Sequence, residues 1–220
     1  NAMFTVGVPA PPVMPAPWAW GHNGDGRLGV GNLPGGATPL PVFMRGALEG
    51  KIVTGIAAGG SHTLALSSEH RLYAWGNDGS GQLGSSAPND PLENFSSKPV
   101  KVDDTGVLSG KEITHMAAGD KHSLAVSSDG LVFAWGDNQS GQLGNGASGL
   151  DVFTGLPIAV TGVLTGKHIN AVSAGGAYSM ALTKDTGELY AWGFNVEGQL
   201  GDGTFVSRTT PVAVTGLGGV

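Results

Sequence analysis

Apolar and polar residues alternate along two kinds of short segment in this chain. In the first kind, Tyr73 and Trp75 fall on one side of an extended segment, and Leu72 and Ala74 fall on the other. The same two-residue alternation runs through residues 62–66. A period of two is the spacing of side chains along a β-strand. Both kinds of segment are therefore predicted to be strands.

Both segments recur in the same order along the chain. The blocks that contain Trp-Gly begin at Trp18 (WAWGHNGDGRLG), Tyr73 (YAWGNDGSGQLG), Phe133 (FAWGDNQSGQLG) and Tyr190 (YAWGFNVEGQLG). Between them lie IAAGGSHTLALS from Ile56, MAAGDKHSLAVS from Met116 and VSAGGAYSMALT from Val172. Successive Trp-Gly tryptophans are 55, 60 and 57 residues apart. A period near 57 indicates a repeat architecture.

Each repeat is predicted to be a small antiparallel sheet. The short links SSEHR, SSDG and TKDTGE between the two blocks are typical of hairpins. A further strand follows a proline in PVFM, PVKV, PIAV and PVAV, and counting the Leu-Gly region gives about four strands per repeat. Four-stranded repeats without helices predict an all-β fold of the β-propeller type.

The two blocks together resemble the repeats of the regulator of chromosome condensation family, whose signature is AAGxxHxLAL followed by AWGxNxxGQLG. The resemblance covers nearly the whole span from Trp18 to Val214. It implies a propeller that in this family typically has seven blades. It also implies a role as a nucleotide exchange factor, a ligase-associated binding domain or an inhibitor.

The repeat count leaves the predicted ring incomplete. Four Trp-Gly blocks accompany three AAGxxH-type blocks, so residues 18–220 form one repeat region with three complete blades and partial terminal blades. Residues 1–17 are expected to be a leader that opens with a cloning remnant, and Phe4 to Val8 are a candidate closing strand. The chain is part of a longer propeller, pairs with a second copy as a homodimer, or closes a small four-bladed ring.

Composition excludes several classes of partner. The formal charge is -6, the pI is about 5.4, and Lys and Arg do not cluster, so binding to nucleic acid is not expected. No apolar stretch reaches the roughly 18 residues of a membrane span. The chain has no cysteine, which removes disulfides and thiolate metal sites. Glycine is abundant at 39 residues, but it recurs at fixed repeat positions, which is typical of turns.

The motifs that resemble catalytic or cofactor sites are excluded by the residues around them. GDGRLG at Gly24 matches GxGxxG, but no helix pattern follows it and the equivalent repeats lose the motif. GALEGK, GVLSGK and GVLTGK have one residue too few for a phosphate loop and recur as blade connections. Histidines show no metal-ligand spacing, and no GxSxG is present. No enzyme activity, cofactor or metal is expected.

Two sets of residues receive predicted roles. The structural set consists of the four repeated tryptophans, expected to pack in the core, and the two equivalent histidines, expected to make hydrogen bonds: Trp20, Trp75, Trp135, Trp192, His62 and His122. The partner-binding set combines positions around the blade histidine with apolar residues in the variable loops: Ser61, Asp120, Lys121, Tyr178, Leu92, Phe95, Leu150, Phe153 and Phe205.

A non-catalytic scaffold for protein–protein interaction is the leading functional prediction, because variable loops project from a rigid repeat. The family resemblance implies guanine nucleotide exchange on a small GTPase as an alternative. In that activity an acidic residue directly precedes a blade histidine, whereas here Asp120 stands one residue earlier. The third alternative is an inhibitor that fills an active site with loop aromatics.

Overall fold

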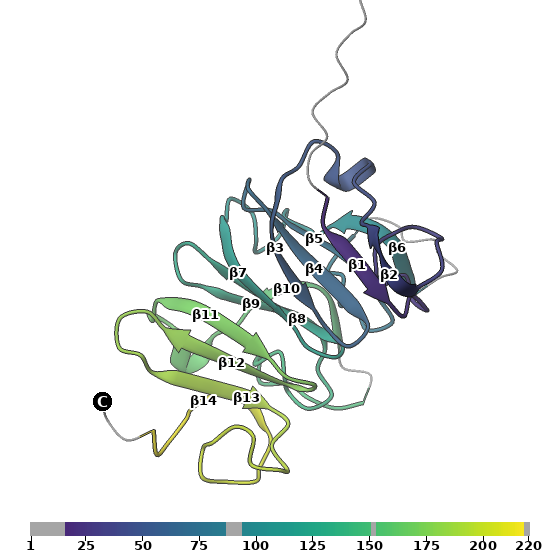
Figure 1. Cartoon of the computed structure of the whole chain (residues 1–220). Coiled ribbons are helices and arrows are strands. Elements are labelled where there is room, and N and C mark those ends of the chain that lie inside the picture. Colours follow the sequence, from purple (N-terminus) through teal and green to yellow (C-terminus); the bar gives the residue numbers. More distant parts are fainter. Residues whose placement is uncertain (1–15, 87–93, 151–152, 218–220) are drawn as a thin grey trace, which may run out of the picture.

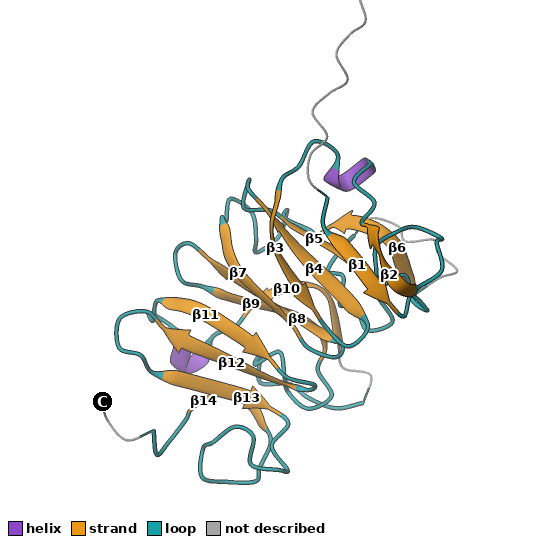
Figure 2. Cartoon of the chain, viewed as in Figure 1, coloured by secondary structure: helices purple, strands orange, loops and turns teal. Residues whose placement is uncertain are grey.

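The computed structural model describes residues 16–86, 94–150 and 153–217, and the side chain of residue 153 lies outside the described part. Within these residues the structure consists of strands and loops with two short 3-10 helices (Figure 2). The strands form one two-stranded and three four-stranded sheets, all antiparallel. The all-β prediction is confirmed.

The sheets follow one another in chain order (Figure 1). The half-blade is β1 (Trp18–Gly21) and β2 (Gly36–Pro41). The first full blade is β3 (Val53–Ala58), β4 (His62–Ser67), β5 (Leu72–Asn77) and β6 (Phe95–Lys101). The second is β7 (Ile113–Ala118), β8 (His122–Ser127), β9 (Val132–Asp137) and β10 (Phe153–Ala159). The third is β11 (Ile169–Ala174), β12 (Tyr178–Thr183), β13 (Leu189–Gly193) and β14 (Arg208–Ala213). The 3-10 helices are η1 (Gly46–Leu48) and η2 (Gly162–Leu164).

One detail of the predicted blade is wrong. The sequence was expected to supply its fourth strand from the Leu-Gly region, but that region is a turn. The AAGxxHxLAL block instead forms two strands, β3 and β4 in the first full blade, which reverse direction at residues 59–61. Glycine and a following polar residue allow this reversal inside a block that alternates throughout.

Alternation along the strands sends the two faces of each blade into two different interfaces. Leu72 and Ala74 lie in one apolar cluster with Phe133 and Trp135 of the second blade. Tyr73, on the opposite face of β5, belongs to a cluster on the half-blade side. A small alanine therefore faces large aromatics across each blade interface, as the repeat predicts. The first and second full blades are buried on both faces because each lies between two neighbouring sheets.

A recurring polar joint links each blade to the one before it. The indole Nε1 of Trp135 donates a hydrogen bond to the backbone oxygen of Gln82, at 2.9 Å. Ser123 Oγ donates to the same oxygen, at 2.8 Å. The same pair of bonds recurs at the other two interfaces. Trp75 Nε1 and Thr63 Oγ1 both donate to the backbone oxygen of Arg27, at 3.0 Å each. Trp192 Nε1 and Ser179 Oγ both donate to the backbone oxygen of Gln142, at 2.8 Å each.

The glycine of Leu-Gly is required by the same joint. Gly84 has a φ of +65°, and a Cβ placed on it would lie 2.5 Å from Nε1 of Trp135. Gly29 and Gly144 meet Trp75 and Trp192 in the same way. No side chain fits between this turn and the next blade's indole. The repeated GQLG segments are thus inter-blade turns, and the GxGxxG match is a consequence of this packing.

Trp20 corrects the prediction that all four repeated tryptophans pack in the core. Trp75, Trp135 and Trp192 are fully buried, whereas the side chain of Trp20 is 61% exposed. The described residues contain no blade before β1, so no turn supplies a carbonyl for this indole. Position in the array, which local pattern does not encode, decides the burial of this residue.

We expect Trp135→Phe to lower the free energy of unfolding by about 2–4 kcal/mol, because it removes a buried hydrogen bond and leaves a cavity. Urea unfolding followed by circular dichroism measures this loss. Trp20→Phe is the matched control and should change stability by less than about 0.5 kcal/mol, as for an exposed side chain. Equal losses in the two variants would contradict the joint described above.

Candidate functional site

The turns between the two inner strands of each blade lie in a row at one end of the blades. We define the axial loop row as residues 59–61, 119–121 and 175–177. Backbone hydrogen bonds join neighbouring turns: Gly60 N donates to Gly119 O, and Asp120 N donates to Gly176 O, each at 3.1 Å. The inner strand β7 contacts both β3 and β11. The row is consequently held rigidly across three blades.

Asp120 occupies the middle of this row, and its side chain is exposed. A Cβ on Gly60 would lie 2.9 Å from Asp120 Oδ1, and one on Gly176 would lie 3.0 Å from Asp120 Oδ2. Glycine at these two positions therefore leaves room for the carboxylate beside both flanking turns. Ser61 Oγ donates to the backbone oxygen of Asp120 at 3.4 Å. Of the partner-binding set, the structure brings Ser61 and Asp120 together.

Lys121 and Arg27 add positive charge to the same end. The Lys121 side chain is exposed, and its backbone oxygen accepts a hydrogen bond from Asp137 N at 2.9 Å. Arg27 Nη1 donates to Gly60 O at 2.9 Å, and its Nη2 pairs with Asp25 at 2.6 Å. The sequence pattern did not single out Arg27, which stands where the three other repeats have glutamine. That departure from the repeat is the signal that could have identified it.

His62 and His122 are buried behind the row and link adjacent blades. His62 Nε2 lies 2.9 Å from Ser123 Oγ, and His122 Nε2 lies 3.0 Å from Ser179 Oγ. Since Ser123 Oγ already donates to Gln82, it accepts from the histidine, and Nε2 therefore carries the proton. This is the hydrogen-bonding role that the sequence predicts for both histidines.

Burial keeps both imidazoles neutral. Desolvation lowers the pKa of His62 to about 4. The pKa of His122 is lowered to about 3, mainly by burial and to a smaller extent by the charge of His62. A buried imidazolium would have no compensating anion here, which is why the neutral form is favoured. These histidines hold the scaffold and are not available to a partner.

Tyr178 takes the histidine position in the third full blade. Its ring packs on Gly175, where a Cβ would lie 2.1 Å from the ring, and the side chain is half-buried. The described residues have no fourth full blade to offer it a serine. Tyr178 therefore lies beside the axial loop row, on the last blade of the array.

The apolar residues of the variable loops do not form one cluster with the axial loop row. Phe95 is half-buried at the start of β6, opposite Asn77. Leu150 is 84% exposed and Phe205 is 72% exposed. Leu92 lies outside the described residues. The backbone of Phe153, in β10, pairs with that of Asp137, in β9. The side chain of Phe153 lies outside the described part.

A hydrogen-bonded turn on the third full blade exposes Phe205, which the sequence identified, together with Val196 and Val206, which it did not. The buried Asn195 organises this turn: its Nδ2 donates to Thr204 O at 3.0 Å and to Val206 O at 3.1 Å. Asn195 Oδ1 accepts from Leu200 N at 2.9 Å. The leucine N–H of every repeat donates to the equivalent side-chain oxygen, of Asn23, Asp78, Asn138 or Asn195, and this bond explains the constant offset from tryptophan to Leu-Gly.

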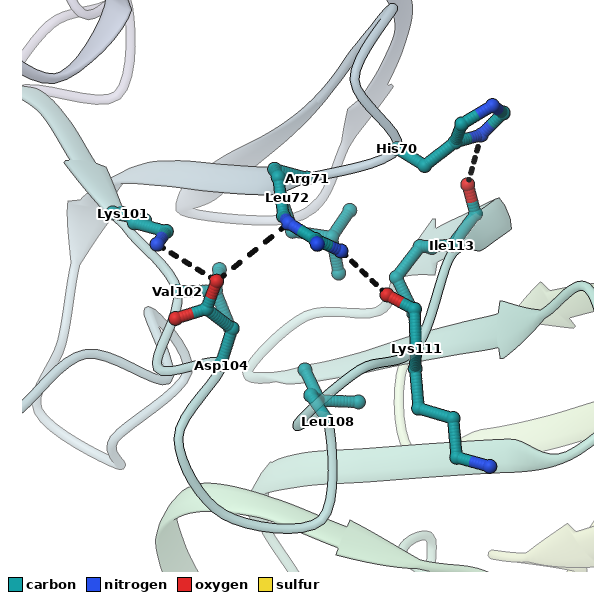
Figure 3. Close-up of a pocket in the computed structure, with 9 residues that line it drawn as sticks. All are labelled: His70, Arg71, Leu72, Lys101, Val102, Asp104, Leu108, Lys111 and Ile113. Carbon is teal, nitrogen blue, oxygen red and sulfur yellow. Dashed lines mark hydrogen bonds and ion pairs between the residues drawn. The ribbon is translucent and has the colours of Figure 1, made fainter.

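The opposite end of the blades carries a small pocket between the first and second full blades (Figure 3). Its polar groups face one another: Arg71 Nη1 donates to Lys111 O at 2.6 Å, and His70 Nδ1 lies 3.1 Å from Ile113 O. The cavity holds about 10 Å³, enough for about one water molecule. These contacts join blades and leave no room for a larger ligand.

The three glycine-lysine segments also lie at this end and connect successive blades. Each lysine pairs with an acidic residue on the hairpin of its own blade: Lys51 with Glu69 at 2.7 Å, Lys111 with Asp129 at 2.5 Å, and Lys167 with Glu188 at 2.7 Å. Exposed pairs of this kind contribute little to stability because solvent screens them. They are blade connections, as the sequence predicts, and not phosphate loops.

The described residues contain no metal-binding cluster and no membrane-spanning helix. No group of three or more His, Cys, Asp or Glu side chains there is placed to hold a metal ion. Among the helices that the structure describes, none is long and apolar enough to cross a membrane. The exposed polar groups of the axial loop row thus stand out as the best candidate surface for a partner.

Repeated four-stranded blades joined face to face define the class of the protein: it is a β-propeller repeat protein. The model of the regulator of chromosome condensation (RCC1) repeat matches residues 18–66, 69–126, 129–182 and 186–220. A second model of the same repeat matches residues 53–82, 113–142 and 169–199. The chain belongs to the RCC1 repeat family, which confirms the resemblance seen in the sequence.

Similar proteins are longer than this chain. The ultraviolet-B receptor UVR8 of Arabidopsis thaliana is 36% identical over 202 residues, which cover 91% of this chain and 42% of the receptor. Human WBSCR16 superposes with a TM-score of 0.75 at 27% identity, covering 90% of this chain and 48% of that one. Prp20p of Saccharomyces cerevisiae superposes with a TM-score of 0.72 at 25% identity, covering 91% of this chain and 46% of Prp20p.

Stability should fall as the pH drops from about 6.5 toward 4. A histidine in the unfolded chain has a pKa near 6.5, whereas the pKa values of His62 and His122 in the folded chain are lower. In this pH window the unfolded chain therefore binds more protons than the folded chain, which favours unfolding. Each histidine adds a slope of up to about 1.4 kcal/mol per pH unit. Urea unfolding between pH 4.5 and 7 measures the slope. His122→Gln should halve it, and an unchanged slope would contradict the assignment.

Proposed function

We propose that this chain is a non-catalytic scaffold whose axial loop row binds a protein partner. The observation that carries this proposal is the exposed carboxylate of Asp120, set between Gly60 and Gly176 on three turns that are joined by backbone hydrogen bonds. A rigid row of turns loses little conformational entropy on binding. Charged groups on such a row favour a partner with complementary charge.

Different groups of the axial loop row hold the blades together and face solvent, and this separation supports the proposal. The backbone groups and the buried His62 and His122 hold adjacent blades together. The side chains of Asp120 and Lys121 are exposed, and the inter-blade hydrogen bonds of the row use neither of them. Residues that the fold does not need for packing can vary with the partner.

The chain's relatives supply a consistent precedent for protein binding. The structural study of Prp20p, a protein 25% identical to this chain, describes binding to Gsp1p and histones. Another relative, HERC2 of Homo sapiens, is an E3 ubiquitin-protein ligase that is 31% identical over 253 residues, covering 92% of this chain and 5% of the ligase. For the present chain, which spans less than half of either relative, binding to a protein remains our proposal.

Nucleotide exchange on a small GTPase is the second candidate function. The exposed Asp120 favours it, because a carboxylate on the axial loop row could enter a phosphate site and compete with bound nucleotide. His122 cannot share that task, because it is buried and neutral. Inhibition by loop aromatics is a weaker candidate, since Phe95 is half-buried and Phe205 lies on the last blade.

A double variant with Asp120→Asn and Lys121→Ala should reduce partner capture at least tenfold, because the two substitutions remove charge from the axial loop row without changing the core. Affinity capture from an extract of the source organism, followed by quantitative mass spectrometry, measures the loss. Asp185→Asn is the matched control, since Asp185 is exposed on the hairpin between β12 and β13 at the opposite end. A partner set that is identical for all three proteins would contradict the proposal.

Exchange activity is tested separately with a panel of small GTPases loaded with a fluorescent guanine nucleotide. If the second candidate holds, the chain accelerates nucleotide release from one of them, and Asp120→Asn abolishes most of the acceleration. If the scaffold proposal alone holds, release stays at the intrinsic rate while capture in the preceding experiment still depends on Asp120.

A further inference from the structure

The turn between β13 and β14 exposes three apolar side chains on the third full blade. We define the Phe205 turn as residues 194–207. Within it Val196 is 52% exposed, Phe205 is 72% exposed and Val206 is 59% exposed. The ring of Phe205 lies beside Gly198, where a Cβ would be 3.3 Å from Phe205 Cε1. The early and late parts of the turn are therefore in contact.

Polar side chains beneath this surface fix the Phe205 turn in place. The buried Asn195 donates from Nδ2 to Val206 O at 3.1 Å. Thr204 N donates to Asp202 Oδ1 at 2.9 Å, and Arg208 pairs with the same carboxylate at 2.7 Å. A turn that is already ordered loses little conformational entropy when a partner binds it.

The second full blade builds the same turn, which makes a position-by-position comparison possible. Asn138 Nδ2 donates to Ala147 O at 3.0 Å, as Asn195 Nδ2 donates to Thr204 O at 3.0 Å. The residue after Ala147 is Ser148, so Ser148 is the counterpart of Phe205. By the same alignment, Gln139 is the counterpart of Val196 and Gly149 that of Val206.

Exposed polar positions of the second blade thus become apolar in the third. Gln139 and Ser148 are exposed even though a further blade follows them. These two positions therefore face solvent because of their place in the repeat, and not because the array ends. Exposed apolar surface is unfavourable in water, and an ordered group of such side chains is typical of a binding surface.

Glu197 adds a negative charge next to the apolar group. Its side chain is exposed and forms no ion pair among the described residues. The other two full blades have serine at this position, Ser80 and Ser140. The third full blade therefore combines exposed apolar side chains with a carboxylate, and this combination favours a partner that carries positive charge.

We propose that the Phe205 turn binds a basic amphipathic segment of a partner protein. Apolar side chains of the segment cover Val196, Phe205 and Val206, and a lysine or arginine of the segment pairs with Glu197. The turn lies at the same end of the blades as the axial loop row, since Phe194 N donates to Ala177 O at 2.9 Å. The surface goes beyond that row, because none of its contact side chains belongs to the row.

A triple variant that gives the third blade the residues of the second tests the proposal. It carries Val196→Gln, Phe205→Ser and Val206→Gly, which the same turn accommodates in the second blade. The probes are short peptides selected from a displayed random library on the unmodified chain. We expect the selected peptides to combine aromatic or aliphatic residues with lysine or arginine. In fluorescence anisotropy the triple variant should bind them at least about tenfold more weakly.

Two single variants separate the apolar and the charged contributions. Glu197→Ser should weaken binding several-fold and remove most of its salt dependence, because the remaining contacts are apolar. Val163→Gln is the matched control, since Val163 is 50% exposed on η2 at the opposite end, and it should leave binding unchanged. Equal binding to the unmodified chain and the triple variant would overturn the proposal. So would failure to select any peptide, or selection of apolar peptides that lack lysine and arginine.

Two further outcomes would assign the surface or the peptides differently. A dimer detected by light scattering and abolished in the triple variant would overturn the proposal in favour of a second copy of this chain. The double variant with Asp120→Asn and Lys121→Ala should bind the selected peptides as the unmodified chain does. Loss of peptide binding in that variant would place the peptides on the axial loop row and overturn this assignment. Failure here is thus distinguishable from failure of the partner-capture experiment.

Discussion

The architecture depends on one recurring hydrogen bond, from a buried indole N–H to the carbonyl of the turn that ends the preceding blade. The bond between Trp135 and Gln82 is the central example, and it appears again at Trp75 and Trp192. A buried carbonyl and a buried indole each lose hydration, so each needs the other. Because donor and acceptor belong to different repeats, the bond stabilises the interface between blades and not the blade alone.

This joint gives the array a direction. Each blade offers a carbonyl at its following side and a tryptophan at its preceding side, so the two ends of the array differ. At one end Trp20 has no preceding turn and is exposed. At the other, Tyr178 and the turn around Asn195 have no following blade among the described residues. In repeat proteins stability accumulates from such nearest-neighbour interfaces.

The same geometry separates scaffold from surface. Burial removes His62 and His122 from solvent and keeps them neutral, so their hydrogen bonds serve adjacent blades only. One or two residues before each histidine, the chain turns at the end of the blade, and Asp120 and Lys121 lie in solvent. The exposed Asp120 and Lys121 therefore directly precede the buried His122. Because His122 is held rigidly between blades, it fixes the position of the two exposed residues.

By itself the sequence determined the strand class, the repeat and the family. It could do so because two-residue alternation and the constant offset from Trp75 to Leu83 are local properties. It misplaced the fourth strand of each blade, because the reversal at residues 59–61 interrupts an alternation that looks continuous. Only the tertiary structure decided that Trp20 is exposed and that Ser61 and Asp120 meet. Those facts depend on which blade lies next to which, and a repeat pattern is identical whether or not a neighbour is present.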